Sequence, residues 1–371
     1  MTLKIHYITA GSTNPYGISE SDGTTLVQCI TPQKYINKLK GMKATISSKT
    51  ETIDRDLVDQ ADVIVFQRQI IGPVLQEAKR YKGKKLLVYD LDDYLWDLEG
   101  PTKENWPPQK CLLLDLFIQH CDLITCHSEE VKNRLEKRFP DKSVEYMPPM
   151  VDFEIGKKIK TFTNENIIRI GWFGSVSHKK IIDHVSYAML NIARKNEDVI
   201  LVFLGYMPES IPNTLQWWQW EYYSWVEVDR FYKTLGGLDL HIGIAPLWDN
   251  DFAKTRSYRK ILDYGMFKTA IVATNVEPFK NLPNDLCLFV DKKNKINKWE
   301  NALENVIEDK KFRRYLQQKS YEFAKDHDAT IQAKKWIEVY KKYEKESTKK
   351  KEKNRKTNNK SSRSSKKSST K

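Results

Sequence analysis

The residues with the clearest chemical potential lie on one predicted helix. Arg256, Lys260 and Asp263 are spaced i, i+4 and i+7, which places two cations and one carboxylate on the same helical face. Two cations beside a helix N-terminus favour an anion such as a phosphate, and a carboxylate can accept hydrogen bonds from sugar hydroxyls. The alternative is an amphipathic helix whose polar stripe faces solvent. The spacing alone leaves both interpretations open.

A buried strand must bring this helix to a ligand site. The apolar run that carries Ile242 and Ile244 is short and stops at a proline, which is typical of a buried parallel strand. A polar loop over 248–254 follows, and we predict that the helix begins near Thr255 or Ser257, both good N-caps. In open α/β sheets, ligands bind outside the carboxyl ends of the strands, where this loop would lie.

A second candidate site follows the strand predicted over 167–175. Gly174 and Ser175 end this strand, and His178 and Lys179 come next. Backbone N–H groups, a hydroxyl, an imidazole and a cation can all meet a phosphate here without a large side chain in the way. An ordinary strand-to-helix turn is the alternative. We favour a phosphate site.

The third candidate site is acidic. The strand predicted over 84–89 runs into Asp90, Asp92 and Asp93. Three carboxylates in four residues at a strand end would repel one another in a closed site unless they bind something. They could bind the hydroxyls of an acceptor, hold Mg²⁺ or Mn²⁺ through hard oxygen ligands, or form a solvated acidic turn.

The order strand, loop, helix occurs repeatedly in both halves of the chain, which predicts an α/β protein with two Rossmann-like, doubly wound domains. We expect the first domain to span 1–155 and the second 156–329. A helix over 330–346, apolar on one broad face, follows. Residues 347–371 contain only polar residues, chiefly lysine and serine, and are predicted to be disordered.

The net charge of +13 belongs mainly to this tail. Residues 341–371 carry 14 lysines and arginines against three glutamates, so the rest of the chain is close to neutral. The tail could contact nucleic acid or acidic surfaces. A near-neutral body argues against a broad duplex-binding surface on the folded domains.

The cysteines and the apolar runs predict the cellular compartment of the protein. Five cysteines, an odd number, are scattered without the close spacing of a zinc site, which indicates free thiols in a reducing environment. The N-terminus lacks the apolar core of a signal peptide, and no run is long enough to span a membrane. We therefore expect a cytoplasmic protein without a transmembrane segment.

An aromatic stretch lies over residues 215–225. It holds four tryptophans and two tyrosines: Trp217, Trp218, Trp220, Trp225, Tyr222 and Tyr223. Aromatic rings in this number could stack on bases or sugars, but more often they fill a core or cover an apolar groove.

The second half of the chain resembles the group 1 glycosyltransferases, a large retaining family with the two-domain GT-B fold. The resembling motifs lie within 167–279. They read Ile170-Gly-Trp-Phe-Gly-Ser-x-x-His178, Leu238-Asp-x-x-Ile-x-Ile-Ala-Pro-Leu247, Asn250-x-Phe252, Arg256-Ser257-x-x-Lys260-x-Leu-Asp263-Tyr264 and Val272-Ala-Thr. The order of these motifs is specific, whereas the first half fits the fold with weaker motifs. The resemblance also implies that the helix over 330–346 packs back on the N-terminal domain.

This resemblance implies transfer of a hexosyl or related sugar from a nucleotide-diphosphate sugar, with retention and without an obligatory metal or other cofactor. It implies catalytic roles for Asp92 and Asp93 on the acceptor side and for Arg256 and Lys260 at the diphosphate. The implied donor-binding residues are Gly174, Ser175, His178, Asn250, Phe252, Ser257 and Asp263, with Asp263 at the nucleotide ribose and no metal ligand among them.

The chain departs from the family at two positions. Asp263, one methylene shorter, stands where the family carries the glutamate that binds the ribose. Many members carry a glutamate that binds the donor sugar where this chain has Thr255. That role is then vacant or has moved to Asp249, Asn250 or Asp251. Asp90 and Asp92 also resemble the acid pair that holds Mn²⁺ in single-domain glycosyltransferases.

Other functions stay open on the sequence. A sugar-nucleotide epimerase would use the same fold, and an inactive homologue could bind nucleic acid through the basic tail. The acceptor is equally open, and a polysaccharide, a lipid or modified DNA would each fit.

Overall fold

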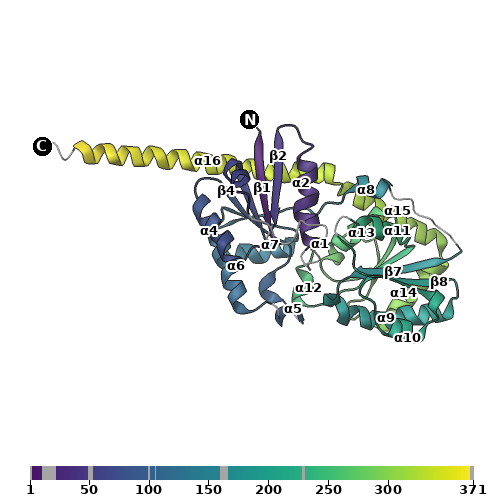
Figure 1. Cartoon of the computed structure of the whole chain (residues 1–371). Coiled ribbons are helices and arrows are strands. Elements are labelled where there is room, and N and C mark those ends of the chain that lie inside the picture. Colours follow the sequence, from purple (N-terminus) through teal and green to yellow (C-terminus); the bar gives the residue numbers. More distant parts are fainter. Residues whose placement is uncertain are drawn as a thin grey trace.

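The structure, a computed structural model, consists of two α/β domains and a long last helix (Figure 1). It describes residues 2–10, 22–48, 53–98, 101–104, 106–158, 166–227 and 230–367. A segment that contains the short helix α8 (Phe153–Lys158) leads from the first domain to the second. The predicted α/β class with two doubly wound domains is confirmed.

The first domain is built on a six-stranded parallel sheet with the order β2-β1-β3-β4-β5-β6. Its strands are β1 (Leu3–Thr9), β2 (Met42–Ser48), β3 (Val63–Gln67), β4 (Leu86–Leu91), β5 (Leu123–Cys126) and β6 (Ser143–Tyr146). Its helices are α1 (Asp22–Thr25), a π-helical turn (Leu26–Ile30), α2 (Thr31–Ile36), α3 (Arg55–Gln60), α4 (Gly72–Tyr81), α5 (Pro101–Glu104), α6 (Pro108–His120) and α7 (Glu129–Arg138).

Successive residues of the central strand β3 face opposite sides of this sheet, as the two-residue period of a strand requires. Ile64 and Phe66 pack in a core with α4, α6 and α7. Val63 and Val65 pack in a second core with α2 and the last helix. Both faces are thus buried, which is why the strands are nearly continuous apolar runs.

The second domain has a six-stranded parallel sheet with the order β12-β11-β10-β7-β8-β9. Its strands are β7 (Ile168–Gly174), β8 (Val199–Gly205), β9 (Trp220–Tyr223), β10 (Ile242–Ala245), β11 (Ala270–Thr274) and β12 (Leu288–Val290). Its helices are α9 (Lys179–Lys195), α10 (Ser210–Thr214), α11 (Phe231–Gly237), α12 (Asp251–Lys254), α13 (Arg259–Met266), α14 (Ile296–Glu308) and α15 (Lys310–Asp326).

The last helix, α16 (Ala329–Lys367), packs against the first domain. Trp336 is buried there, and its Nε1 donates a hydrogen bond to the carbonyl oxygen of Pro148 at 3.0 Å. Lys342 forms an ion pair of 2.8 Å with Glu145. Because α16 starts at the end of the second domain, it ties the two domains together.

Helix α16 is longer than the predicted 330–346 and projects away from the domains toward its C-terminus (Figure 1). Only its backbone is described beyond Lys349. A lysine-rich helix without an apolar face has little to stabilise it in water, so disorder of residues 347–371 in solution stays a prediction. No helix within the described residues is both long and apolar enough to span a membrane.

Candidate functional site

The candidate site lies at the carboxyl ends of β7 and β10. These strands are neighbours in the second sheet, although the chain leaves them toward opposite edges. Such a reversal of strand order is where open α/β sheets bind ligands. The loops that follow β7 and β10 are the two that carry the glycine-serine and the 248–254 motifs.

Two glycines form the floor of this site. Gly174 and Gly205 pair at the ends of β7 and β8. Gly205 has φ +100°, and a Cβ there would lie 2.4 Å from the carbonyl oxygen of Gly174. A side chain at Gly205 would therefore collide with the end of β7, so the two strand ends approach this closely only with a glycine there. Gly205 was not predicted as a site residue, although a glycine at a strand end was an available signal.

Lys260 reaches from α13 to the end of β7. Its Nζ donates a hydrogen bond to the carbonyl oxygen of Phe173 and lies 4.8 Å from the centre of the Trp172 ring. Burial, together with the nearby Arg256 guanidinium, lowers the pKa of Lys260 to about 7. Burial disfavours the protonated form of this lysine. An anion bound beside it would stabilise the protonated form and raise its pKa.

Arg256 and His178 meet beside this lysine. The Arg256 Nη1 donates a hydrogen bond to His178 Nε2 at 2.7 Å, so that nitrogen is an acceptor and the imidazole is neutral. Burial and then the charges of Arg256 and Lys260 hold the pKa of His178 well below its ordinary value. The structure thus brings together Arg256 and Lys260, which were predicted at the diphosphate, and His178, which was predicted to bind the donor from a separate motif.

The predicted helix start near residue 255 or 257 is wrong. Asn250 caps the short helix α12, because its Oδ1 accepts a hydrogen bond from the backbone N–H of Ala253 at 2.8 Å. Helix α13 begins only at Arg259. Arg256 and Ser257 therefore lie in the turn between the two helices rather than on the helical face of Lys260.

Asp263 is buried within the second domain. Its Oδ1 accepts hydrogen bonds from Arg259 Nε at 2.8 Å and from the Tyr232 hydroxyl at 3.3 Å. Burial raises the pKa of Asp263, and the Arg259 guanidinium opposes this shift. Arg259 also donates to the carbonyl oxygen of Met150 at the end of the first domain. The sequence reasoning missed Arg259, although its i, i+4 spacing to Asp263 was an available signal.

Thr255 does not replace the glutamate that the resembling family carries at this position. Its side chain is buried, and its hydroxyl donates a hydrogen bond to the carbonyl oxygen of Phe252 at 2.7 Å. Phe252 in turn packs against the core of the first domain, and the Arg256 guanidinium lies 5.1 Å from its ring centre. This stretch therefore contributes to the contact between the domains.

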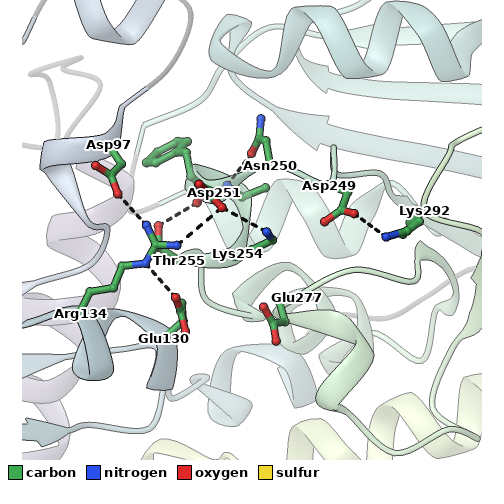
Figure 2. A network of polar contacts seen from close by, with 12 residues as sticks. Asp97, Glu130, Arg134, Asp249, Asn250, Asp251, Lys254, Thr255, Glu277 and Lys292 are labelled. Atoms are coloured by element: carbon green, nitrogen blue, oxygen red, sulfur yellow. Dashed lines mark hydrogen bonds and ion pairs between the residues drawn. The ribbon is translucent and has the colours of Figure 1, made fainter. Parts of the chain in front are cut away.

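Figure 2 shows how polar side chains from both domains meet around α12. Arg134 of α7 forms ion pairs with Asp97 at 2.6 Å and with Glu130 at 2.8 Å. Its guanidinium also lies 4.0 Å from Asp251, which pairs with Lys254 at 3.1 Å. Asp251 is thus the carboxylate of this loop that faces the first domain.

The loop after β10 is held by the segment that follows β12. The buried Asn294 donates a hydrogen bond from Nδ2 to the carbonyl oxygen of Leu247 at 2.8 Å and accepts one from the Thr274 hydroxyl at 2.7 Å. Asp249 forms an ion pair of 3.0 Å with Lys292. These contacts hold the loop in place before any ligand binds.

The predicted acceptor-side carboxylates lie at the end of β4. Asp92 Oδ2 pairs with Arg68 at 3.1 Å and accepts a hydrogen bond from the Thr24 hydroxyl at 3.2 Å. Its Oδ1 is buried without a hydrogen-bond partner among the described residues. Burial and Asp92 raise the pKa of Asp93, whereas the Arg256 and Arg68 charges lower it. The charge of Arg256 in the second domain therefore acts on Asp93 of the first domain.

Asp90, the third carboxylate, makes its side-chain contacts within the first domain. Its Oδ1 accepts a hydrogen bond from Thr125 at 2.5 Å and lies 3.1 Å from Nε2 of His127. Asp90 and Asp92 therefore belong to different networks of side-chain contacts. Across the described part of the chain, no group of three or more His, Cys, Asp or Glu side chains could hold a metal ion.

Two parallel, doubly wound domains that contact each other beside this site define the GT-B class of fold. Solved structures of that class are similar over almost the whole chain. Sucrose-phosphate synthase from Thermosynechococcus elongatus has a TM-score of 0.68 at 10% identity, covering 92% of this chain and 99% of that one. HepE of Anabaena, solved in complex with UDP-glucose, has a TM-score of 0.64 at 11% identity, covering 92% and 100%.

A glycosyltransferase from Rickettsia africae ESF-5 has a TM-score of 0.61 at 12% identity, covering 92% of this chain and 98% of that one. No family model matches the chain, and a search of curated proteins gives no match. Structural similarity at identities this low shows the fold alone, so the function must be argued from the site.

Proposed function

We propose that the protein transfers a sugar from a nucleotide-diphosphate sugar to an acceptor hydroxyl. The observation that carries this proposal is the convergence of Lys260, Arg256 and His178 beside the glycine floor at the point where the strand order reverses. Such a set of cations and donors fits a diphosphate. The complex of HepE with UDP-glucose supports a sugar nucleotide as the donor class.

In this proposal the protein stabilises the leaving diphosphate as the bond to the sugar breaks. Lys260 and Arg256 supply positive charge, and Gly174, Ser175 and Ser257 supply further donors. Both hydrogen bonds of Asp263 among the described residues end on Oδ1, which leaves Oδ2 for the ribose hydroxyls. We propose retention, with the leaving phosphate accepting the acceptor proton and with protein cations in place of an obligatory metal.

The acceptor and the sugar are assigned to the side of the site that faces the first domain. The Oδ1 of Asp92, which has no hydrogen-bond partner among the described residues, is assigned to the acceptor hydroxyl, and Asp93 orients that hydroxyl toward the anomeric carbon. We assign the donor sugar to Asp251, because it is the carboxylate of the 248–254 loop that faces the first domain, beside Arg134. All five cysteines are free, which supports a cytoplasmic enzyme.

A thermal-shift panel of UDP-, GDP- and ADP-linked sugars tests the proposal. A donor at 100 times its Kd should stabilise the native state by about 2.7 kcal/mol. We expect one nucleotide series to raise the melting temperature, and Arg256→Ala to abolish that increase. No stabilisation by any sugar nucleotide would contradict the proposal. Conversion of the donor sugar to its epimer without an acceptor would support an epimerase instead.

Donor affinity should fall as the pH rises above about 7. The free enzyme has Lys260 with a pKa near 7, and the diphosphate binds the protonated form. Each pH unit above this value should therefore weaken binding about tenfold until the pKa of the complex is reached. Calorimetric titration from pH 6 to 9 measures this effect.

The matched variant for this titration is Lys260→Arg, which keeps its charge throughout this range. Its binding profile should be flat over the same pH values. A wild-type affinity that stays constant from pH 6 to 9 would show that Lys260 does not contact the donor.

A further inference from the structure

Arg259, the first residue of α13, pairs with only one oxygen of the Asp263 carboxylate. A guanidinium and a carboxylate often pair through two parallel hydrogen bonds. Here the Arg259 Nε donates to Oδ1 of Asp263 at 2.8 Å, and Oδ2 accepts no hydrogen bond from any described residue. The carboxylate is therefore held by one oxygen, and the other stays available to a ligand.

The rest of the Arg259 guanidinium binds groups other than this carboxylate. Its Nη2 donates to the hydroxyl of Tyr232 on α11, and that hydroxyl donates to the same Oδ1 of Asp263 at 3.3 Å. Its Nη1 donates to the carbonyl oxygen of Met150. The guanidinium therefore cannot turn toward Oδ2 of Asp263 without breaking two other hydrogen bonds.

Met150 lies in the segment through which the chain passes from the first domain to the second. Val151, the next residue, forms two backbone hydrogen bonds of 2.9 Å with residues 327–329, where the chain crosses back. The carbonyl oxygen that binds Arg259 is therefore next to the point where the two crossings pair. Through Arg259, the carboxylate of Asp263 is held relative to this point.

The same contacts keep Asp263 a hydrogen-bond acceptor beside the diphosphate site. Burial raises the pKa of Asp263, and the Arg259 charge opposes this shift. An ionised carboxylate only accepts hydrogen bonds, which suits the hydroxyls of a sugar ring. Lys260, which is assigned to the diphosphate, lies three residues before Asp263 on α13, so the two are neighbours on the helix surface.

We propose that Arg259 positions Asp263 so that its second oxygen selects a ribose over a deoxyribose. This inference rests on the proposed function and deepens it, because it names sugars linked to ribonucleoside diphosphates as the donors. A ribose offers two adjacent hydroxyls to a carboxylate, whereas a deoxyribose offers one. Loss of a hydrogen bond to a charged group typically weakens binding by at least about tenfold.

Calorimetric titration of the full chain tests the proposal. The ligands are UDP, GDP and ADP with their 2′-deoxy forms, dTDP, and inorganic pyrophosphate. The wild type should bind one ribonucleoside diphosphate at least about tenfold more tightly than its 2′-deoxy form.

The informative variant is Arg259→Lys. It keeps a positive charge beside Asp263, but a single ammonium cannot replace the three N–H groups of the guanidinium. Its preference for the ribonucleotide should fall below about threefold. Pyrophosphate, which has no ribose, should bind the variant and the wild type equally.

Two further variants complete the experiment. Asp263→Asn removes the carboxylate charge and should lose the ribose preference to the same degree as Arg259→Lys. Arg194→Met is the matched control, because Arg194 is an exposed arginine in the last turn of α9. It should keep the preference of the wild type.

Three outcomes would overturn the inference. Equal binding of ribonucleotide and deoxyribonucleotide by the wild type would show that Asp263 does not select the ribose, while the diphosphate assignment stands. A full ribose preference in Arg259→Lys would show that Asp263 is positioned without Arg259. An equal loss of pyrophosphate and nucleotide binding in that variant would show a general structural role. A wild type that binds none of these ligands contradicts the proposed function, and the inference with it.

Discussion

Lys260→Ala should lower kcat/KM for donor turnover by about 10²–10³-fold. Removing one preorganised donor from a site of developing negative charge typically costs this much. Lys260 is such a donor because its Nζ is held at the end of β7 by the carbonyl oxygen of Phe173. Donor hydrolysis at pH 6.5, where the wild-type lysine is protonated, measures the loss.

The fold should survive this substitution. Burial lowers the pKa of Lys260, so the native state is destabilised by the charged lysine at low pH, and an alanine removes that cost. The melting temperature should therefore stay within about 4 °C of the wild type. Lys233→Ala, an exposed lysine on α11, is the matched control and should keep full activity. Wild-type turnover by Lys260→Ala would exclude the diphosphate assignment.

Trp336→Ala should reduce the free energy of unfolding by about 3–5 kcal/mol, as truncation of a large buried aromatic does. The Trp336 side chain is buried against the first sheet, its Nε1 bonds to Pro148, and its ring lies 5.2 Å from that of His127. The loss should appear in urea unfolding followed by far-UV circular dichroism. This loss measures how much the packing of α16 on the first sheet contributes to the free energy of unfolding.

Ile331→Ala on the same helix provides the comparison. Ile331 is 44% exposed, so its truncation should cost less than about 1 kcal/mol. Trp336→Phe, which keeps most of the apolar volume, should fall between the two. Equal stability of the Trp336 and Ile331 alanine variants would contradict the packing of α16 on the first domain.

The sequence predicted the buried strands well. The strands predicted over 84–89 and 167–175 are observed as β4 and β7 within about two residues, because a strand buried on both faces is an apolar run. The edge strands β2 and β9 were not predicted. Each pairs with only one neighbour and carries polar or exposed residues, so neither shows an apolar run.

The start of the helix near residue 256 shows the limit of local reasoning. Thr255 and Ser257 are both good N-caps by residue type. The chain instead uses Asn250 as a cap, turns after Thr255 and restarts at Arg259. Phe252, which packs against the core of the first domain, belongs to the short helix that results. A contact between domains is not visible in local spacing.

By itself, the sequence determined the residue types available for a diphosphate site and the two doubly wound domains that present them. Those follow from local patterns, because strand and helix periods act over a few residues. Only the tertiary structure decided which groups meet. The charge of Arg256 acts on Asp93 of the other domain, and Lys260 acquires a pKa near 7 from burial beside that arginine. Burial and electrostatic fields depend on residues far apart in the chain, and folding alone brings them together.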